Sequence, residues 1–442
     1  MTLQKEVYMR SVKEIQRTYY LVISLFWLAT ALPISLLVLF AQARGLNLFQ
    51  VGIVMGLYSL TIVLLEIPTG GLADTIGRKR VSLLAYSVTL LSGIVLLGAF
   101  SFPIFLFGFM LSGVGRALSS GALDAWFVDA LKAADPNIDL QPAFAKVGTF
   151  SLLSLGVGTL GGSLIPGFFK HLPVDGTAIF TPLSMPLAIA GVVFLLLLLT
   201  VIFLVKEEQP STSKNTWLDG VREIPGMVKT AVSLTQQNNV LLLLLGATSV
   251  SGFVLLSLES FWQPHFADLF GGSEGNTVWF GVIMGGNFLV GMLGNMIVTP
   301  VSKALGKRYG LVAAIFQGLR GILLIGLALQ GNLPIAVLLF WLIYLNMGAV
   351  NSPHNTLLNE QIPSEQRSSM LSIESLASYL GSAVGGILLG YIAEQLSISI
   401  AWLISGGALV LSLFLYLKIE FLQHKEREIE FHDKERPVLE TS

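Results

Sequence analysis

Several ionisable side chains stand inside long apolar stretches of the sequence, and the leading candidates among them are Glu66, Arg116, Glu259, Arg320 and His354. Only 12% of the 442 residues are charged. A charged group at the centre of a bilayer costs roughly 2.5 to 3.5 kcal/mol or more, so such a group is a candidate for function. A carboxyl or imidazole group can take up and release a proton, and a guanidinium group can bind an anion. These residue types predict proton and substrate sites within the apolar stretches.

Glu66 is the predicted proton-coupling residue. In the stretch LLEIPTGG it precedes Pro68, and a proline ring frees a backbone carbonyl group and bends a helix. Burial favours the protonated form of a carboxyl group, so Glu66 could exchange a proton when water reaches it. The alternative is a static carboxyl group that holds a hydrogen bond.

The two arginines suit different roles. Arg116 lies about 13 residues into its stretch, which is about 20 Å at 1.5 Å per residue, so we place it near the middle of a membrane. It could bind an anionic substrate group or respond to a nearby carboxylate such as Asp124, and the alternative is a purely structural ion pair. No partner for Arg320 can be identified from the sequence.

Two further candidates lie in the second half of the chain. Glu259 stands in LESFWQPHF beside Trp262, a mixture of acid and aromatic residues that suits a lipophilic cation. Aromatic residues at this depth also form the interfacial belt of membrane proteins, which is the alternative interpretation. His354, in NSPHN, could change its charge near neutral pH. A neutral, hydrogen-bonded histidine is the alternative, so His354 ranks below Glu66.

These candidates require helices that cross a bilayer. Apolar runs of about 20 residues are long enough to do so, and the sequence has twelve. Backbone polar groups in hydrocarbon must be satisfied within their own segment, which favours helices over strands. The predicted fold class is an all-α membrane protein, with spans at 18–42, 48–73, 81–101, 103–131, 145–169, 182–205, 240–266, 277–300, 309–330, 333–361, 368–393 and 398–421.

Composition excludes several other classes. The net charge is −1 and the chain has no cysteine, so we expect no nucleic-acid partner, no disulfide and no thiolate metal site. No cluster of metal ligands and no set of nucleophile, base and orienting group can be assembled, so we expect neither an enzyme nor a cofactor. Residues 1–43 resemble a signal peptide, but their apolar run is too long and eleven more follow, which predicts an uncleaved first helix.

Lysine and arginine residues indicate the orientation. If both termini are cytosolic, all but four of the 26 lysines and arginines fall in cytosolic segments. Arg44 and Lys170 lie in outer loops, and Arg116 and Arg320 lie within helices. By the positive-inside rule, the sequence predicts a multi-pass protein of the cell membrane with both termini in the cytosol.

The sequence also contains an internal repeat. VGIVMG at 51–56 matches FGVIMG at 280–285 with an offset of 229 residues, which also carries Gly77-Arg78-Lys79 onto Gly306-Lys307-Arg308. Parallel repeats of this kind are typical of transporters whose two halves move about a central site. We predict two six-helix halves.

The predicted domain boundaries follow from this repeat. The two halves are residues 1–205 and 240–422, and the polar stretch 206–239 joins them. The spacing of apolar residues in this linker predicts a helix on the inner membrane surface. The tail 423–442 is highly charged and poor in apolar residues, which predicts disorder.

The stretch GGLADTIGRKR, at 70–80, places one acid and three bases between the second and third predicted helices. Asp74 at the membrane edge needs a basic partner or a helix N-terminus, and Arg78 is the nearest base. Asp124 and Asp129, near the inner end of the fourth helix, could hold Arg78 or Lys79 from the other side. We predict a breakable cytosolic latch, and the alternative is a loop that serves only to orient the chain.

This stretch resembles a known signature. Gly70, Asp74, Gly77, Arg78 and Lys79 resemble the loop G-x-x-x-D-R-x-G-R-[KR]-x of the major facilitator superfamily. Thr75 stands where that family usually has arginine, and in the second half Lys303 replaces the acid, so the same pairing is not expected there.

The resemblance covers essentially the whole chain and implies two pseudo-symmetric six-helix bundles. In that family helices 1, 4, 7 and 10 line the cavity. The residues that would fall on this lining set are Arg116, Asp124, Glu259 and His354, whereas Arg320 would fall on a supporting helix.

Two further stretches resemble the drug:proton antiporters of this family in part. Helix 4 reads GVGRALSSGALDAW, with Ser120 in place of a glutamine, and helix 5 reads GVGTLGG, with Gly158 in place of a proline. Ordinary close packing through Gly158, Gly161 and Gly162 is the alternative to a mechanistic role for helix 5. The motifs that sugar porters carry after helices 6 and 12 are missing.

The leading hypothesis is therefore a monomeric, proton-coupled exporter of small lipophilic or amphipathic compounds, with the lipid bilayer, protons and a small-molecule substrate as its partners. An importer or exchanger of a polar metabolite is the alternative. It would need more polar groups in the cavity than the sequence reveals. A receptor or an intramembrane enzyme finds little support.

Overall fold

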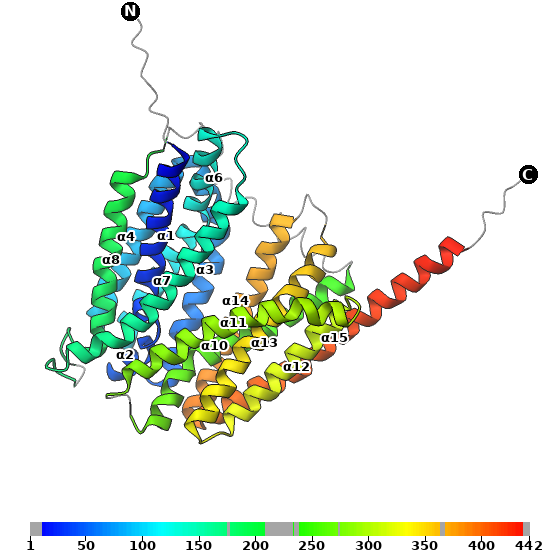
Figure 1. The fold of residues 1–442 in the computed structure, drawn as a ribbon. Helices are drawn as coiled ribbons and strands as arrows, with labels where there is room; N and C mark the ends of the chain where they lie inside the picture. Colours follow the sequence, from blue (N-terminus) through cyan, green and yellow to red (C-terminus); the bar gives the residue numbers. More distant parts are fainter. Residues whose placement is uncertain are drawn as a thin grey trace, which may run out of the picture. The chain divides into compact units, whose positions relative to one another are not determined.

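The computed structural model describes residues 11–174, 177–207, 233, 238–272, 275–362 and 367–435. Within these residues the chain is helical and forms no strand, and it has twelve spans long and apolar enough to cross a membrane (Figure 1). The predicted all-α fold class is confirmed. Side chains at 67–68, 70–71, 73–75, 367–369, 371–372 and 426–435 lie outside this description.

The first half follows the predicted order of spans, with two of them broken. Its elements are α1 (Val12–Ile34), α2 (Leu37–Ala43), α3 (Leu48–Ile76), α4 (Arg78–Leu97), α5 (Phe102–Ser119), α6 (Ala122–Ala134), α7 (Gln141–Phe168), the short 3₁₀ helix η1 (Pro182–Ser184) and α8 (Met185–Leu204).

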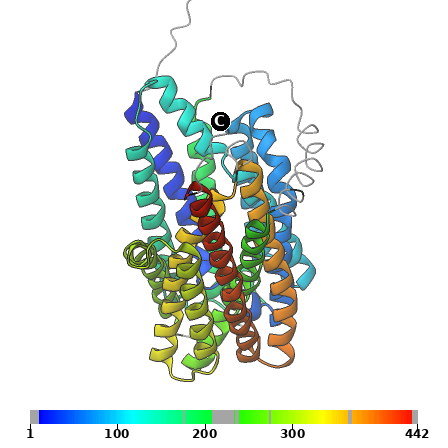
Figure 2. The same cartoon turned by 90° about the vertical axis from the view of Figure 1, so that its right-hand side faces the viewer.

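The second half consists of one helix per predicted span. These helices are α10 (Asn239–Phe270), α11 (Thr277–Ala304), α12 (Tyr309–Ala328), α13 (Leu333–Glu360), α14 (Arg367–Gln395) and α15 (Ile398–Glu435). Figure 2 shows the long last helix, in dark red, beside the other helices of this half.

The chain forms two compact units: Met1–Pro225 with Gln263–Gly285, and Gly226–Trp262 with Gly286–Ser442. In the first unit α1 packs on α7 and α8, α4 packs on α5 and α8, and α3 packs on α5. In the second unit α12 packs on α13 and α15, and α14 packs on α15. Because lipid tails are as apolar as the side chains, these contacts are driven by close packing and hydrogen bonds rather than by removal from water.

The first predicted span is broken, contrary to expectation. Pro33 lies in the last turn of α1, where its ring and missing N–H weaken the helix, and Leu36 leaves the helical conformation. The Gln263 side chain fills the gap within the first unit, since its Oε1 accepts from the backbone N–H of Val38 at 2.9 Å and its Nε2 donates to the carbonyl of Ile34 at 3.0 Å. One carboxamide thus satisfies backbone groups on both sides of the break.

The fourth predicted span is also broken. Gly121 between α5 and α6 has φ +73°, a left-handed conformation that glycine adopts readily and other residues resist. Arg116 consequently lies in the last turn of α5, whereas Asp124 lies in the first turn of α6.

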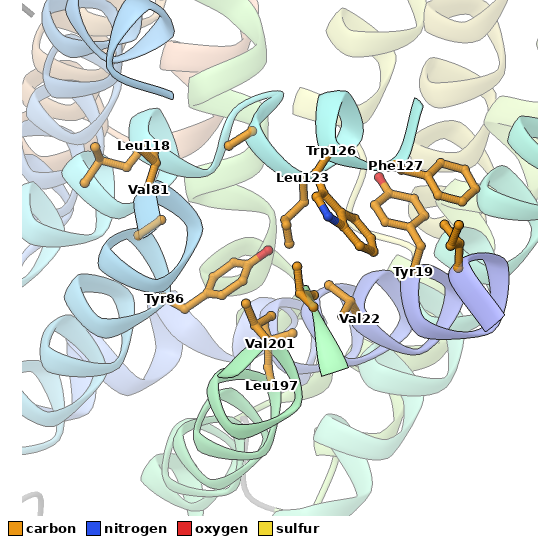
Figure 3. Close-up of a cluster of buried hydrophobic side chains, with 14 of the residues drawn as sticks. Tyr19, Val22, Val81, Tyr86, Leu118, Leu123, Trp126, Phe127, Leu197 and Val201 are labelled. Atoms are coloured by element: carbon orange, nitrogen blue, oxygen red, sulfur yellow. The ribbon is translucent and has the colours of Figure 1, made fainter. Parts of the chain in front are cut away.

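The core of the first unit gathers side chains from six helices, α1 and α4 to α8. Figure 3 shows Tyr19 of α1, Tyr86 of α4, Leu118 of α5, Trp126 of α6 and Leu197 of α8 in one buried cluster. Tyr19 stacks on Phe127 with ring centroids 4.1 Å apart. The Trp126 indole donates to the carbonyl of Lys206 at 3.0 Å, so this core also holds the chain just after α8.

The end of the chain differs from the prediction. Disorder was expected from residue 423, but α15 continues to Glu435. The stretch 423–435 is rich in Glu, Lys and Arg, which are strong helix formers. It extends a membrane helix that already supplies the helical nucleus, so a low apolar content did not end the helix. Residues 436–442, and the linker helix expected within 206–239, lie outside the described residues.

Two of the three glycines predicted for helix packing lie against α1. A Cβ added to Gly162 would sit 1.8 Å from the carbonyl oxygen of Leu32, and one added to Gly158 would sit 2.7 Å from the Cβ of Ala31. A Cβ on Gly161 would meet no described atom within 4 Å. The close approach of α7 to α1 therefore depends on the spacing of four between Gly158 and Gly162.

We predict that Gly162→Ala destabilises the protein, because the new Cβ would meet a backbone atom that cannot move without shifting α1. Overpacking of this kind costs about 1 to 3 kcal/mol. A thermal unfolding series in detergent should show a lower midpoint for Gly162→Ala than for the wild type. Gly161→Ala is the matched control and should unfold like the wild type. Equal midpoints for the two variants would contradict the packing role of Gly162.

Candidate functional site

The loop between α3 and α4 is a single glycine. Gly77 has φ +100°, and Arg78 begins α4 directly after it. The Arg78 guanidinium pairs with the carboxylate of Asp129 on α6. The ammonium group of Lys79 donates to the carbonyl of Ile202 on α8 at 2.8 Å. Arg78 therefore has an acidic partner on the fourth span, as the latch hypothesis requires, whereas Lys79 contacts a backbone group. Gly70 and Asp74 lie within α3, but the surroundings of Gly70 and the side chain of Asp74 lie outside the description.

Glu207, which was not predicted from the sequence, is a further acid in this site. The Glu207 carboxylate accepts from the backbone N–H groups of Arg78 at 2.7 Å and Lys79 at 2.9 Å. The first N–H groups of a helix have no partner within the helix and carry partial positive charge, so a carboxylate there is stabilising. Glu207 lies three residues after the end of α8 and about 130 residues after Arg78, so no local sequence pattern indicates that it caps α4.

The second half has a comparable arrangement that uses a different acid. The Arg308 Nε donates to Glu420 of α15 at 2.8 Å, and the same carboxylate accepts from the backbone N–H of Leu311 in α12 at 3.3 Å. No equivalent of the first-half pairing was expected here, because Lys303 replaces the acid of the loop. Glu420 instead reaches this helix start from the last helix.

Asp124 lies at the break in the fourth span. Its carboxylate accepts a hydrogen bond from the Tyr19 hydroxyl of α1. Tyr86 of α4 interacts electrostatically with both Asp124 and Arg116. The Asp124 and Arg116 side chains are exposed although both lie in a membrane-spanning segment. Arg78 and Lys79, for which Asp124 was a possible partner, are held by other groups.

Glu66 lies half-buried on α3. One turn further on, the Thr69 hydroxyl donates to the carbonyl of Ala117 at 3.1 Å, which joins α3 to α5 near the fourth-span break. Its predicted role in proton coupling stays a prediction.

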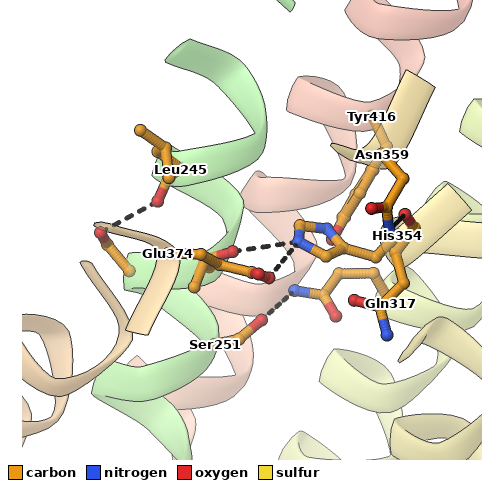
Figure 4. A network of polar contacts seen from close by, with 10 residues as sticks. Leu245, Ser251, Gln317, His354, Asn359, Glu374 and Tyr416 are labelled. Atoms are coloured by element: carbon orange, nitrogen blue, oxygen red, sulfur yellow. Dashed lines mark hydrogen bonds and ion pairs between the residues drawn. The ribbon is translucent and has the colours of Figure 1, made fainter. Parts of the chain in front are cut away.

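His354 is the centre of a polar network in the second unit. It is buried on α13, and its ring contacts three side chains from three other helices (Figure 4). The distances are 2.9 Å from Nδ1 to the Tyr416 hydroxyl, 3.0 Å from Nε2 to the Glu374 carboxylate, and 3.2 Å from Nε2 to the Thr248 hydroxyl.

These contacts define how the imidazole can hold protons. A neutral imidazole has one N–H, whereas a charged one has two. Since a carboxylate only accepts, a neutral His354 places its N–H on Nε2 for Glu374, and Nδ1 accepts from the Tyr416 hydroxyl. A second proton on Nδ1 would require that hydroxyl to turn, and it would convert the His354–Glu374 contact into an ion pair. Glu374 was missed, although an acid within the apolar run 368–393 meets the criterion applied to Glu66.

Arg320 is buried on α12, with 3% of its surface exposed. Its Nε and Nη2 have no hydrogen-bond partner among the described residues. It interacts electrostatically with Tyr344, Tyr416 and Glu259. Glu259 of α10 is the one acid in this set, but the described residues show no ion pair between it and Arg320, and its own side chain is exposed.

Trp262 lies in the core rather than on an exposed surface. It is 1% exposed and stacks on Phe340 with ring centroids 5.6 Å apart. The neighbouring Gln263 spans the first-helix break. The polar and aromatic stretch that suggested a lipophilic cation site therefore contributes mainly packing and backbone hydrogen bonds in this structure.

The residues matched by a family model decide the classification. The model of the Major Facilitator Superfamily matches residues 19–343 and 280–440, which together cover most of the sequence. The chain belongs to the major facilitator superfamily. No curated protein matches the sequence of this facilitator.

Solved structures with the same fold include several transporters. A nucleoside transporter, NupG, superposes with a TM-score of 0.74 at 14% identity, covering 92% of this chain and 99% of the other. A bacterial homologue of the human lysosomal transporter Spinster gives 0.69 at 14% identity, covering 93% and 96%. A POT family transporter gives 0.64 at 16% identity, covering 91% and 96%. At these identities the likeness shows the fold alone.

The four candidates expected on cavity-lining helices of this facilitator divide into two groups. Arg116, Asp124 and Glu259 are exposed, whereas His354 is buried. Arg320, expected on a supporting helix, is buried and interacts electrostatically with Tyr344 of the predicted lining helix α13.

We predict that Asp129→Asn impairs transport without reducing membrane insertion. Exposed ion pairs contribute up to about 1 kcal/mol, or about fivefold in an equilibrium, so the transport rate should change by a factor of about two to five. Initial rates in vesicles, normalised to protein in the membrane, measure this effect. Asp135→Asn is the control, since Asp135 is exposed and accepts a backbone hydrogen bond from Asn137. Equal rates for both variants and the wild type would exclude the latch.

Proposed function

We propose that this facilitator is a secondary transporter that uses a proton gradient to move a small organic solute by alternating access. The contact of His354 with Glu374 and Tyr416 carries the proposal. A carboxylate and an imidazole 3.0 Å apart within membrane-spanning helices form a hydrogen-bonded pair with one net negative charge while the imidazole is neutral, and an ion pair once the imidazole gains a proton. Such a pair changes its charge distribution when a proton arrives or leaves.

The rest of the network gives that proton a structural effect. Tyr416 contacts His354 and also interacts electrostatically with Arg320, which in turn interacts with Glu259. We propose that a proton that reaches His354 also changes the electrostatic environment of the buried Arg320 cation. Glu66 and Asp124 provide a second group of carboxylates in the first unit.

Two classes of solute are candidates. The partial resemblance of helices 4 and 5 to drug:proton antiporters favours export of small lipophilic or amphipathic compounds. Import or exchange of a polar metabolite is the second candidate. Two proteins with the same fold are associated with polar compounds: NupG is described as a nucleoside transporter, and the POT family transporter was solved with a conjugated peptide. In both cases we propose a monomer in the cell membrane with cytosolic termini.

A panel of solutes tests the proposal. Cells or proteoliposomes that contain the protein are loaded with fluorescent lipophilic cations in one series and with radiolabelled polar metabolites in another. Transport is then followed with and without an uncoupler. Gradient-driven movement of any solute that the uncoupler abolishes supports proton coupling. Saturable transport that is unchanged by the uncoupler, and by a reversed proton gradient, contradicts it.

We predict that Glu374→Gln abolishes uphill accumulation while solute exchange at equal concentrations continues. The amide keeps the volume and one hydrogen bond to His354 but cannot form the ion pair. Counterflow and proton-driven uptake in the same proteoliposomes separate the two activities. Glu394→Gln makes the same charge change at an exposed position of the same helix and should behave as the wild type. Full accumulation by Glu374→Gln would exclude this pair from coupling.

Glu66→Gln is predicted to have the same effect if Glu66 carries the coupled proton. A proton that moves down a membrane potential gains about 2.3 kcal/mol per 100 mV, which corresponds to a solute gradient of about fiftyfold. The variant should lose that gradient and retain substrate binding. A gradient as steep as that of the wild type would make Glu66 a structural residue, with Asp124 or Glu259 as the next candidate.

A further inference from the structure

An open cavity of about 630 Å³ lies on the second unit between α11 and α13. Its lining residues are all polar: Asn295 of α11, and Asn351, Ser352, Asn355, Thr356, Asn359 and Glu360 of α13. We call this cavity the asparagine groove. Its volume lies within the usual range of about 300 to 1,000 Å³ for small-molecule sites.

The α13 residues of the groove form one face of the helix. They repeat at intervals of four, as 351, 355 and 359 and as 352, 356 and 360, and residues at this spacing lie above one another. The face extends over ten residues, from 351 to 360, or about 14 Å at a rise of 1.5 Å per residue. Val350, Leu357 and Leu358, on the other side of α13, are buried in the hydrophobic core of the second unit.

This polar face cannot lie against lipid. All its members except Thr356 are exposed, although α11 and α13 are both membrane-spanning helices. An exposed carboxamide in hydrocarbon would lose its hydrogen bonds to water and gain nothing in return. The asparagine groove therefore faces water, at the end of α13 that we expect on the cytosolic side, where a transported solute would enter or leave.

The groups in the groove determine what it can bind. Carboxamides and hydroxyls both donate and accept hydrogen bonds and carry no charge. None of the described lining residues is cationic, and Glu360 carries the one negative charge. An anionic solute would therefore find no counter-ion and one repelling carboxylate. A lipophilic compound would find no hydrophobic residue, only the carbon atoms of polar residues.

Contacts within the helices orient two of these amides. Asn359 Nδ2 donates to the backbone carbonyl of Asn355 at 2.7 Å (Figure 4), and Asn295 Nδ2 donates to the carbonyl of Gly291 at 3.5 Å. Each amide thus uses a donor on its own helix and presents its Oδ1 oxygen as an acceptor. Amides both donate and accept hydrogen bonds, as the hydroxyl groups of a polyhydroxylated molecule do, so the two kinds of group can pair.

We infer that the asparagine groove binds the transported solute and that this solute is neutral and rich in hydroxyl groups, as sugars, polyols and the ribose of nucleosides are. This assignment rests on the proposed transport function and selects between its two solute classes. It also explains how binding reaches the proton site. Asn355 is the residue next to His354 on α13, so a solute held by one face of the helix lies beside the imidazole on the other.

The test measures binding to the purified full-length protein in detergent, without a proton gradient. The neutral probes are glucose, mannitol and uridine, and the matched charged probes are glucuronate, glucosamine and uridine monophosphate. Tetraphenylphosphonium represents the lipophilic cations. Isothermal calorimetry and thermal stabilisation give the affinities. At least one neutral probe should bind, and its anionic analogue should bind at least tenfold more weakly.

Groove variants then locate the binding. Asn355→Ala should weaken binding of the neutral probe by about three- to tenfold, the usual effect of one hydrogen bond. The double variant Asn355→Ala with Asn359→Ala should weaken it further. Both should keep the wild-type unfolding temperature, because their side chains are exposed. Asn137→Ala, at an exposed position of a loop in the first unit, is the control and should bind as the wild type does.

Several outcomes would overturn the assignment. It fails if no neutral probe binds, if tetraphenylphosphonium or an anionic analogue binds more tightly than every neutral probe, or if the groove variants keep the wild-type affinity. Failure of the proposed proton coupling would give a different set of results. If the groove variants weaken binding but an uncoupler does not affect transport, proton coupling is contradicted and the groove remains the solute-binding site. If an uncoupler abolishes transport but the groove variants do not change it, only the assignment of the groove as the solute-binding site is contradicted.

Discussion

The structure depends on one constraint, which is that backbone N–H and carbonyl groups cannot stay unpaired in hydrocarbon. An unbroken helix meets this requirement by itself, but this chain breaks two of its spans. At the first break the Gln263 carboxamide pairs with groups on both sides, at Ile34 and Val38. The same requirement applies at helix starts, where Glu207 and Glu420 accept the free N–H groups of α4 and α12. Side chains that are distant in the sequence thus form hydrogen bonds with backbone groups that have no partner within their own helix.

The two halves solve their packing in the same way despite little sequence identity. Gly158 and Gly162 let α7 approach the backbone of α1, and Gly381 and Gly385 let α14 approach Ser249 and Phe253 of α10. Each pair is spaced by four residues, so both glycines face the same neighbour. Close approach of this kind maximises van der Waals contact, which is the main source of helix association in lipid. In each half, the fifth helix can therefore pack closely against the first because glycines at the contact have no side chain.

Much of the architecture could be predicted because it depends on patterns within single segments. Length and hydropathy predicted the twelve spans, and proximity to Asp129 suggested a partner for Arg78. The breaks at Leu36 and Gly121 were missed, because a proline or glycine in an apolar run weakens a helix without showing whether another segment will stabilise a break.

The partners across helices were the hardest part to predict. The hydrogen bonds of Asp124 with Tyr19 and of His354 with Glu374 join residues 105 and 20 positions apart. Local periodicity contains no information on such pairs. The asparagines of α13 were visible in the sequence, yet their common face became informative only when the structure showed which side of the helix is buried. That division has an evolutionary consequence. A single-nucleotide change can turn an asparagine codon into one for serine, aspartate or lysine, and on the exposed face of α13 it leaves Leu357 and Leu358 in place. New solute preferences could thus arise in this lineage without the folding defects that usually eliminate mutations in a membrane helix.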